Sequence, residues 1–143
     1  MSTQEERLNL VREILERPTE TVKLETEQGV IEVVLRYPAN KERIEAMLEA
    51  SKLPEYKELS ELEKTSIQME FLAKRIIQSI RINGEEKQID WENGNAVILE
   101  QLVTLASSWY QAKRAYWAKQ IQPYLLPFLQ QTRELLQLSS TTF

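Results

Sequence analysis

The stretch TVKLETEQGVIEVVLRY, residues 21–37, decides the fold class. Alternate residues are apolar on both sides of Gln28-Gly29, namely Val22, Leu24, Ile31, Val33 and Leu35. A period of two on both sides of a glycine-containing turn predicts a β-hairpin. Because an isolated hairpin is marginally stable in water, we expect its apolar face to pack on helices.

The sequence around this hairpin has helical periodicity. Capping-box pairs, Thr3 with Glu6 and Ser60 with Glu63, mark two helix starts, and Asn40 is the candidate cap of another. The predicted helices cover residues 3–17, 40–52, 60–80 and the chain from about residue 91. We therefore predict an α+β fold that is mostly helical, with an N-terminal helix and β-hairpin packed on a bundle of about four helices.

The stretch RINGEEKQIDWENGNAVI, residues 81–98, separates two strongly apolar helical patterns. Asn83-Gly84 is a strong turn signal and predicts a small hairpin, with Arg81-Ile82 and Gln88-Ile89 as its short arms. Asp90, Asn93 and Asn95 are rival caps for the helix that follows. The stretch is therefore expected to be a connector whose acidic residues are solvated.

No domain boundary is visible, so residues 1–143 are predicted to form a single domain. Its expected parts are the hairpin at about 21–37, a helical body at about 40–138 and a frayed tail at 139–143. Pro123 and Pro127 are expected to kink or break the last helical stretch.

Composition excludes several chemistries. Neither cysteine nor histidine is present, so there is no disulfide framework, no thiol nucleophile and no zinc site of the usual kind. Three glycines fit no phosphate-binding motif, and the paired carboxylates are typical of a solvated surface. We expect no enzymatic activity, no cofactor and no metal.

Charge and hydropathy bound the location and the partners. The net charge is −4, which disfavours nucleic acid and anionic membranes as partners. No signal peptide and no run of bilayer-spanning length is found, which predicts a cytoplasmic protein without a membrane partner.

Residues 110–119, YQAKRAYWAK, interleave rings with cations. One interpretation is a helix whose aromatic face contacts another protein or the core, with the cations in water. The alternatives are a nucleic-acid-binding surface and a membrane-binding surface. The residues concerned are the candidate protein-binding rings Tyr110, Tyr116 and Trp117 and the candidate basic patch Lys113, Arg114 and Lys119.

Two tryptophans near this segment receive opposite predictions. Trp109 continues the apolar stripe of Ile98, Leu102 and Leu105, so Trp109→Ala is expected to destabilise the fold. Trp117 is expected on the surface, so Trp117→Ala is expected to spare the fold and to weaken partner binding.

The C-terminal segment IQPYLLPFLQQTRELLQL is more apolar than one short helix can bury alone. Tyr124, Leu125 and Phe128 are therefore further candidate protein-binding residues. Periodicity leaves open whether residues 120–138 form the last core helix or an interface, and a homo-oligomer is one outcome.

The order of parts resembles the tail assembly chaperones of long-tailed bacteriophages. The hairpin TVKLETEQGVIEVVLR, the helix FLAKRIIQSI, the turn RINGEEKQIDWENG and the helix AVILEQLVTLASSWY follow the layout of that family. Ile80, Gly84 and the run from Val97 to Val103 match its helix, turn and apolar helix. The resemblance covers roughly residues 19–106, and residues 110–143 depart from the pattern.

This resemblance implies a non-enzymatic role in the host cytoplasm. Such chaperones bind the tape-measure protein, recruit tail-tube subunits and leave the finished particle. Many are made beside a longer frameshifted form, of which this chain would be the short form. The alternatives are a structural ring or adaptor subunit of a phage neck or tail, and a nucleic-acid-binding accessory protein that uses residues 110–119.

Overall fold

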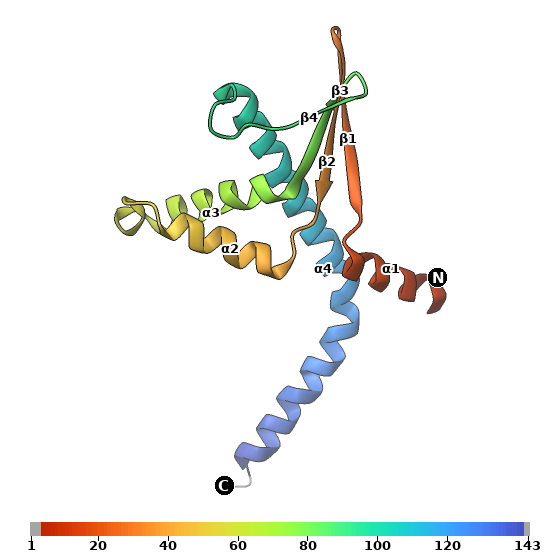
Figure 1. Cartoon of the computed structure of the whole chain (residues 1–143). Coiled ribbons are helices and arrows are strands. Elements are labelled where there is room, and N and C mark those ends of the chain that lie inside the picture. Colours follow the sequence, from red (N-terminus) through yellow and green to blue (C-terminus); the bar gives the residue numbers. More distant parts are fainter. Residues whose placement is uncertain (1–3, 142–143) are drawn as a thin grey trace. The chain divides into compact units, whose positions relative to one another are not determined.

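The computed structural model describes residues 4–141, with side chains except at positions 7, 124 and 139–141. The elements in chain order are α1 (Gln4–Glu16), β1 (Thr19–Thr26), β2 (Gly29–Arg36), α2 (Asn40–Ser51), the 3-10 helix η1 (Tyr56–Glu58), α3 (Glu61–Ile76), β3 (Ile77–Ile82), β4 (Glu85–Lys87) and α4 (Ala96–Thr141) (Figure 1). The predicted mostly helical α+β fold with an N-terminal hairpin is confirmed.

The chain divides into two compact units, Met1–Tyr110 and Gln111–Phe143. In the second unit, every residue that the structure describes belongs to α4. A single helix has no hydrophobic core of its own, so this unit is a helical segment and not a domain in the usual sense. The single-domain organisation stays a prediction.

The predicted hairpin at residues 21–37 is confirmed as β1 and β2, which pair antiparallel from Thr19 opposite Arg36 to Thr26 opposite Gly29. Gly29 has a φ of 145°, in the region that side chains with a Cβ rarely adopt. It also lies against the Asn83 side chain, where an added Cβ would stand only 2.2 Å from Asn83 Oδ1. Gly29 is therefore required both by the turn and by its neighbour.

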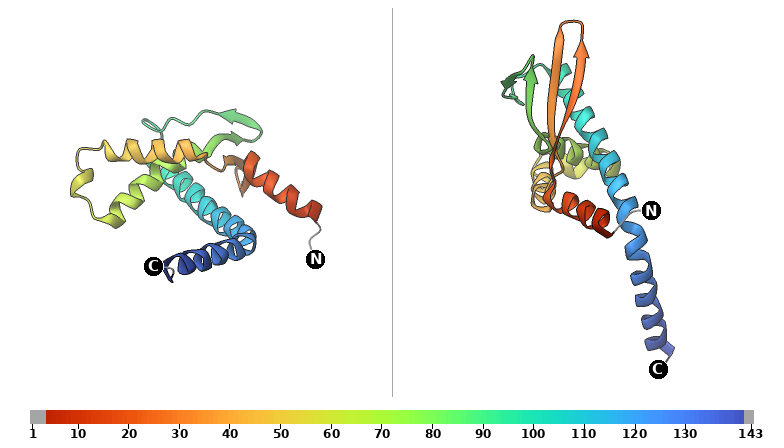
Figure 2. Two further views of the ribbon diagram at one scale, coloured as in Figure 1. Left: turned by 90° about the horizontal axis from the view of Figure 1, so that it is seen from below. Right: turned by 90° about the vertical axis from the view of Figure 1, so that its right-hand side faces the viewer.

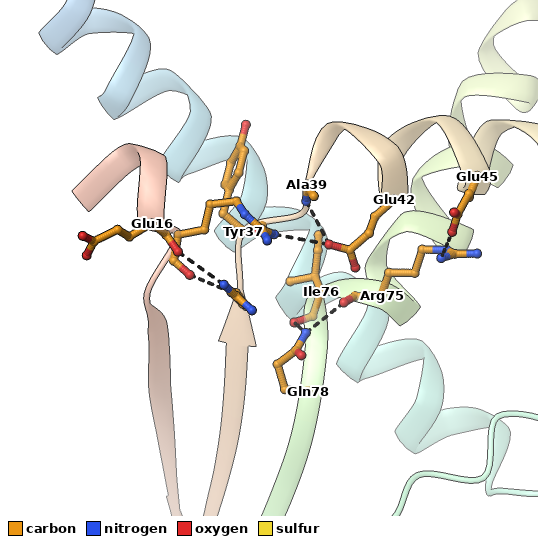
Figure 3. Close-up of polar contacts among 10 residues, drawn as sticks. Glu16, Tyr37, Ala39, Glu42, Glu45, Arg75, Ile76 and Gln78 are labelled. Atoms are coloured by element: carbon orange, nitrogen blue, oxygen red, sulfur yellow. Dashed lines mark hydrogen bonds and ion pairs between the residues drawn. The ribbon is translucent and has the colours of Figure 1, made fainter. Parts of the chain in front are cut away.

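The predicted helix at 60–80 ends earlier than expected. Its capping box is confirmed, because Glu63 N donates to Ser60 Oγ at 3.2 Å. The helix α3 ends at Ile76, where Gln78 Nε2 donates to the carbonyls of Arg75 and Ile76 at 2.9 and 3.0 Å (Figure 3). The prediction that Ile80 lies on this helix is wrong, because Ile80 belongs to β3. The isoleucines at 77, 80 and 82 favour a strand as well as a helix.

The second predicted hairpin is confirmed as β3 and β4, but its arms differ from the prediction. The turn is Asn83-Gly84, with φ values of 50° and 83°, and β4 begins directly after it at Glu85. Two consecutive positive φ values are the geometry of a tight hairpin turn whose twist suits its strands. The predicted second arm at Gln88-Ile89 lies outside β4.

The two hairpins form one antiparallel sheet in the order β1-β2-β3-β4 (Figures 1 and 2). At the tips, Asn83 N donates to Val30 O at 2.9 Å and Val30 N donates to Asn83 Oδ1 at 2.9 Å. Asn83 therefore joins the turn between β3 and β4 to the start of β2. At the other end, a register shift between Val34 and Leu35 accommodates the start of β3.

The core lies in the first unit and combines one face of the sheet with helices. Its largest fully buried side chains are Val33, Leu35 and Ile76. Further core residues come from α2, α3, β3 and the first part of α4, namely Ala46, Leu72, Ala73, Ile77, Leu102, Ala106 and Tyr110.

The pair α2 and α3 is joined by an ionic contact. Arg75 Nη1 lies 2.7 Å from Glu45 Oε2 (Figure 3). Arg75 also pairs with Glu49. Burial lowers the pKa of Arg75, but the hydrogen bonds and charges of Glu49 and Glu45 outweigh it and the pKa lies above its ordinary value. This clamp fixes the two helices side by side while leaving the guanidinium charged.

The predicted cap Asn40 is wrong by one residue. The cap is Ala39, whose N–H donates to Glu42 Oε1 at 2.9 Å (Figure 3). Asn40 is the first helical residue, and its Oδ1 accepts from Arg43 Nη2 at 2.9 Å instead. The glutamate half of a capping box therefore works here without a side-chain oxygen at the cap.

The N-terminal helix was predicted at residues 3–17 and lies at Gln4–Glu16. Its proposed cap, Thr3, lies outside the described residues. The stripe of Leu8, Val11 and Leu15 is exposed in this structure.

The long helix α4 is capped by Asn95, one of the three rivals. Asn95 Oδ1 accepts from Val97 N at 3.0 Å and from Ile98 N at 3.3 Å. Asp90 instead binds the N–H groups of Glu92 and Asn93 in the preceding turn, at 3.1 and 3.0 Å.

Both prolines lie inside α4, so the helix does not break at either of them, and the alternative of a kink stays a prediction. Each proline lacks one N–H donor, which leaves the carbonyls of Lys119 and Pro123 without their usual partner four residues on. Both prolines are exposed, so water can reach these carbonyls. The predicted frayed tail overlaps the last helical residues 139–141, and Thr142 and Phe143 lie outside the described residues.

Candidate protein-binding surface

One side of α4 after residue 120 carries most of its large apolar side chains, whereas Leu126 and Leu138 lie outside it. At 100° per residue, seven side chains fall within about 120° of the helix circumference. We call this set the tail face: Ile121, Leu125, Phe128, Leu129, Thr132, Leu135 and Leu136. Two repeats of seven residues produce it, Ile121-Phe128-Leu135 and Leu129-Leu136.

The tail face is exposed in this structure. Phe128 keeps 63% of its surface, Leu135 and Leu136 each keep 66%, and Leu125 and Leu129 keep about half. The Thr132 hydroxyl donates to Phe128 O at 3.0 Å, so its polar atom is bound within the helix and its methyl group remains for the face. Large apolar side chains gathered at this density on a surface mark a contact site.

The tail face is also free of charge. Residues 120–138 contain two charged side chains: Arg133 lies on the flank of the helix, outside the tail face, and Glu134 projects from the opposite side. That opposite side also carries the glutamines at 130 and 137, whereas Gln122 lies at the edge of the tail face beside Leu129. An anionic membrane attracts helices with many cations on the polar side, which this segment lacks. The face therefore suits an apolar protein surface.

The candidate rings at 110–128 do not form one surface. Tyr110 is buried in the core and stacks on Tyr37 with ring centroids 5.1 Å apart, so its assignment to a binding surface is wrong. Trp117 keeps only 5% of its surface, so its expected exposure is also wrong. Truncation of a tryptophan with this burial is expected to destabilise the protein. Periodicity alone could not reveal what covers either ring.

Three candidates remain exposed. Tyr116 keeps 54% of its surface, and Leu125 and Phe128 belong to the tail face. The side chain of Tyr124 lies outside the part of the chain that the structure describes.

The candidate basic patch is divided. Arg114 and Lys119 are exposed, whereas Lys113 is half-buried and its Nζ lies 5.2 Å from the centre of the Trp117 ring. A cation over a ring face stabilises the helix locally as a pair four residues apart. Since Trp117 and Tyr110 are buried, Tyr116 is the one ring of the three that stays open to stacking on a base.

No metal site was found by geometry among the described residues, where no three acidic, histidine or cysteine side chains come together. The pKa of Asp90 lies below its ordinary value chiefly because the Asn93 backbone and side chain donate hydrogen bonds to it. That carboxylate organises the turn before α4.

Within residues 4–141, no helix is both long enough and apolar enough to cross a bilayer.

Five residues of the tail face were not among the predicted site residues: Ile121, Leu129, Thr132, Leu135 and Leu136. Their signal in the sequence is the repeat of seven that joins Phe128 to Leu135 and Leu129 to Leu136. It was obscured because Pro123 and Pro127 suggested a broken helix. Once the helix is continuous, the repeat places all these side chains on one side.

Comparisons with models of protein families, with curated proteins and with solved structures find no match to this chain. A functional assignment therefore rests on its own residues and on the resemblance in layout described above.

Proposed function

We propose that this chain is a non-enzymatic assembly chaperone or adaptor that binds an apolar helix of a client protein through the tail face. The observation that carries the proposal is the exposure of an uncharged apolar face over four turns of one helix. Helix-in-groove and helix-on-helix recognition use apolar anchors at this spacing.

The size of the tail face supports reversible binding. Full burial of a leucine or phenylalanine side chain contributes about 1.5–3 kcal/mol, so the exposed half to two thirds of five such side chains offers roughly 5–10 kcal/mol. Association itself costs about 4–15 kcal/mol. The two ranges overlap, so the tail face alone supports weak binding at most, which suits a chaperone that holds a client and then releases it.

The resemblance names the client class. If it holds, the client is a tape-measure protein, which is a very long helical protein, and the chain acts in phage tail morphogenesis in the host cytoplasm. Tail-tube subunits would be the second partner. The tail face lies in residues 110–143, the part that departs from the family's layout, so we assign client recognition to a surface specific to this chain.

The proposal is tested by co-expression of the full chain with the tape-measure protein of the same genome, or with helical fragments of it. The measured quantity is the fraction of client that stays soluble and co-purifies. Leu125→Ser with Leu129→Ser should abolish this fraction, because both anchors become polar. The matched control is Gln130→Ser with Gln137→Ser, on the opposite side of the same helix, which should leave it unchanged.

Two results would reject the proposal. One is a client that is equally soluble with the double-leucine variant and with the control. The other is a gene neighbourhood without a tail-tube gene and a long helical tape-measure gene on its two sides, which would remove the phage client while leaving the apolar face to be explained by another partner.

The nucleic-acid alternative has less support than the sequence suggested. It relied on three rings interleaved with Lys113, Arg114 and Lys119, and two of those rings are buried. Binding of a DNA oligomer at low salt with a steep decrease at higher salt would restore it. A ring subunit of a phage neck or tail would instead sediment as a closed oligomer in the absence of a client.

A further inference from the structure

The two edges of the sheet differ in how they are protected from pairing. One edge is β4, which has three residues and is charged at each of them, Glu85, Glu86 and Lys87. The other edge is β1, with eight residues, no proline and continuous pairing to β2. Short and charged edges resist further pairing, whereas long regular edges favour it. β1 is therefore the edge at which another strand can be added (Figure 1).

The backbone groups that β1 directs outward can be deduced from its neighbour. Val30 exchanges hydrogen bonds with Asn83 on the β3 side of β2. Its partner across the hairpin, Glu25, therefore forms a pair without mutual hydrogen bonds, and the Glu25 N–H and C=O point away from β2. These directions alternate along a strand. The backbone N–H and C=O groups of Lys23 and Thr21 therefore also point outward, whereas those of Leu24 point toward Ile31 of β2.

The sequence of β1 is self-complementary in one antiparallel register. When Leu24 lies opposite the same residue of a second copy, Lys23 lies opposite Glu25 of that copy, and Glu25 opposite its Lys23. With the twofold axis at Lys23, the lysines of the two copies would face each other. With the axis at Val22, no charged residue would lie opposite another charged residue. Opposite charges across a strand pair stabilise it and like charges destabilise it.

The side chains at this centre are available. Leu24 keeps 42% of its surface, and Lys23, Glu25 and Thr26 are also exposed. The contact of Lys23 with Glu32 on the same sheet is long, at 4.0 Å, so Lys23 can turn to a closer partner. In the Leu24 register the leucines form a pair without mutual hydrogen bonds, which brings side chains closest together.

We propose that β1 pairs antiparallel with β1 of a second copy of this chain, across a twofold axis at Leu24, and so extends the four-stranded sheet into a continuous sheet of eight strands. This contact is independent of the tail face and of the proposed client. Because the pair involves about five residues from each copy, association is expected to be weak and to depend on concentration.

Sedimentation velocity of the full chain, over concentrations up to about 1 mM, tests the proposal. Leu125→Ser with Leu129→Ser serves as the background, so that association through the tail face does not contribute. In that background Glu25→Lys replaces two attractive pairs by two repulsive ones and should raise the dimer dissociation constant at least about tenfold. Adding Lys23→Glu to Glu25→Lys restores opposite charges and should recover most of the affinity.

A proline pair checks the backbone contact without relying on charge. Glu25→Pro removes an outward N–H and should abolish dimerisation without lowering the melting temperature much, since proline is tolerated on an edge strand. Leu24→Pro removes an N–H directed at Ile31 and should lower the melting temperature. This contrast confirms which residues direct their backbone outward.

A chain that stays monomeric at every concentration in this background overturns the proposal. A dimer whose dissociation constant is unchanged by Glu25→Lys and by Glu25→Pro also overturns it. A dimer that appears only with the intact tail face would assign self-association to that face instead. If the edge pairs only when an extended segment of a client is added, the occupant is the client and the second-copy proposal is wrong.

Discussion

The two ends of α4 carry the same kind of apolar pattern, but only one is covered. In residues 96–110, Leu102, Ala106 and Tyr110 lie in the core against the sheet and the other helices. In residues 121–138 the tail face is exposed. Periodicity therefore predicts that a helix has an apolar side, and does not predict which molecule covers that side.

The largest expected effect separates the two ends directly. Leu102→Ser places a hydroxyl and a cavity in the core and is expected to lower the free energy of unfolding by about 3–5 kcal/mol. Leu129→Ser on the tail face should change it by about 0.5 kcal/mol or less. Urea unfolding followed by circular dichroism measures both, and equal losses would show that the tail face is also core.

The next effect concerns Trp109, whose Nε1 donates to Glu20 Oε2 at 2.9 Å. Trp109 packs against the core while remaining partly exposed, so Trp109→Ala should cost about 3 kcal/mol. Trp109→Phe keeps much of the packing, loses the hydrogen bond and should cost about 1–2 kcal/mol. The same unfolding series measures the difference. An unchanged free energy of unfolding in Trp109→Ala would place this ring outside the core.

The prolines give a smaller effect of opposite sign. Pro127→Ala returns an N–H donor to the Pro123 carbonyl and is expected to stabilise the helical segment locally by roughly 1–3 kcal/mol. Hydrogen exchange should become slower at residues 125–131 and stay unchanged at residues 98–106. Unchanged exchange around residue 127 would mean that neighbouring contacts already compensate for the missing donor.

The smallest effect is a pH dependence at the start of α4. The pKa of Asp90 is lowered in the folded state, so its contribution to stability is present above the pKa of the unfolded chain, near 3.9, and is lost as the pH falls through the folded pKa. Asp90→Asn should therefore be less stable than the wild type at neutral pH. The difference should vanish in acid, as measured by thermal unfolding at several pH values, and a constant difference would contradict this cause.

Local signals predicted much of the fold. Alternation predicted the first hairpin, Asn83-Gly84 predicted the second turn, and Ser60 with Glu63 predicted the start of α3. Each depends on neighbours in the chain, so each can be deduced from a short stretch. The prediction of where α3 ends was wrong because it depends on a distant contact. Ile77, Ile80 and Ile82 fit a helix or a strand, and pairing with β2 makes this segment a strand.

Contacts between distant segments could not be predicted. The union of both hairpins into one sheet depends on the pairing of β2 with β3, from Ile31 opposite Ile82 to Leu35 opposite Ile77, which are far apart in the sequence. Burial of Tyr110 depends on Tyr37 in the same way. The tail face was visible in part, through Leu125 and Phe128, but its full extent required knowing that α4 continues through two prolines.

Hydroxyl-radical footprinting of the full chain tests the contrast within α4 most directly. In the free protein, Phe128 and Leu129 should be oxidised rapidly and Leu102 and Tyr110 slowly after correction for the intrinsic reactivity of each residue type. Addition of the helical client should protect the tail face and leave the core residues unchanged. Slow oxidation of Phe128 and Leu129 in the free monomeric chain would contradict the account, because the face would then already be covered.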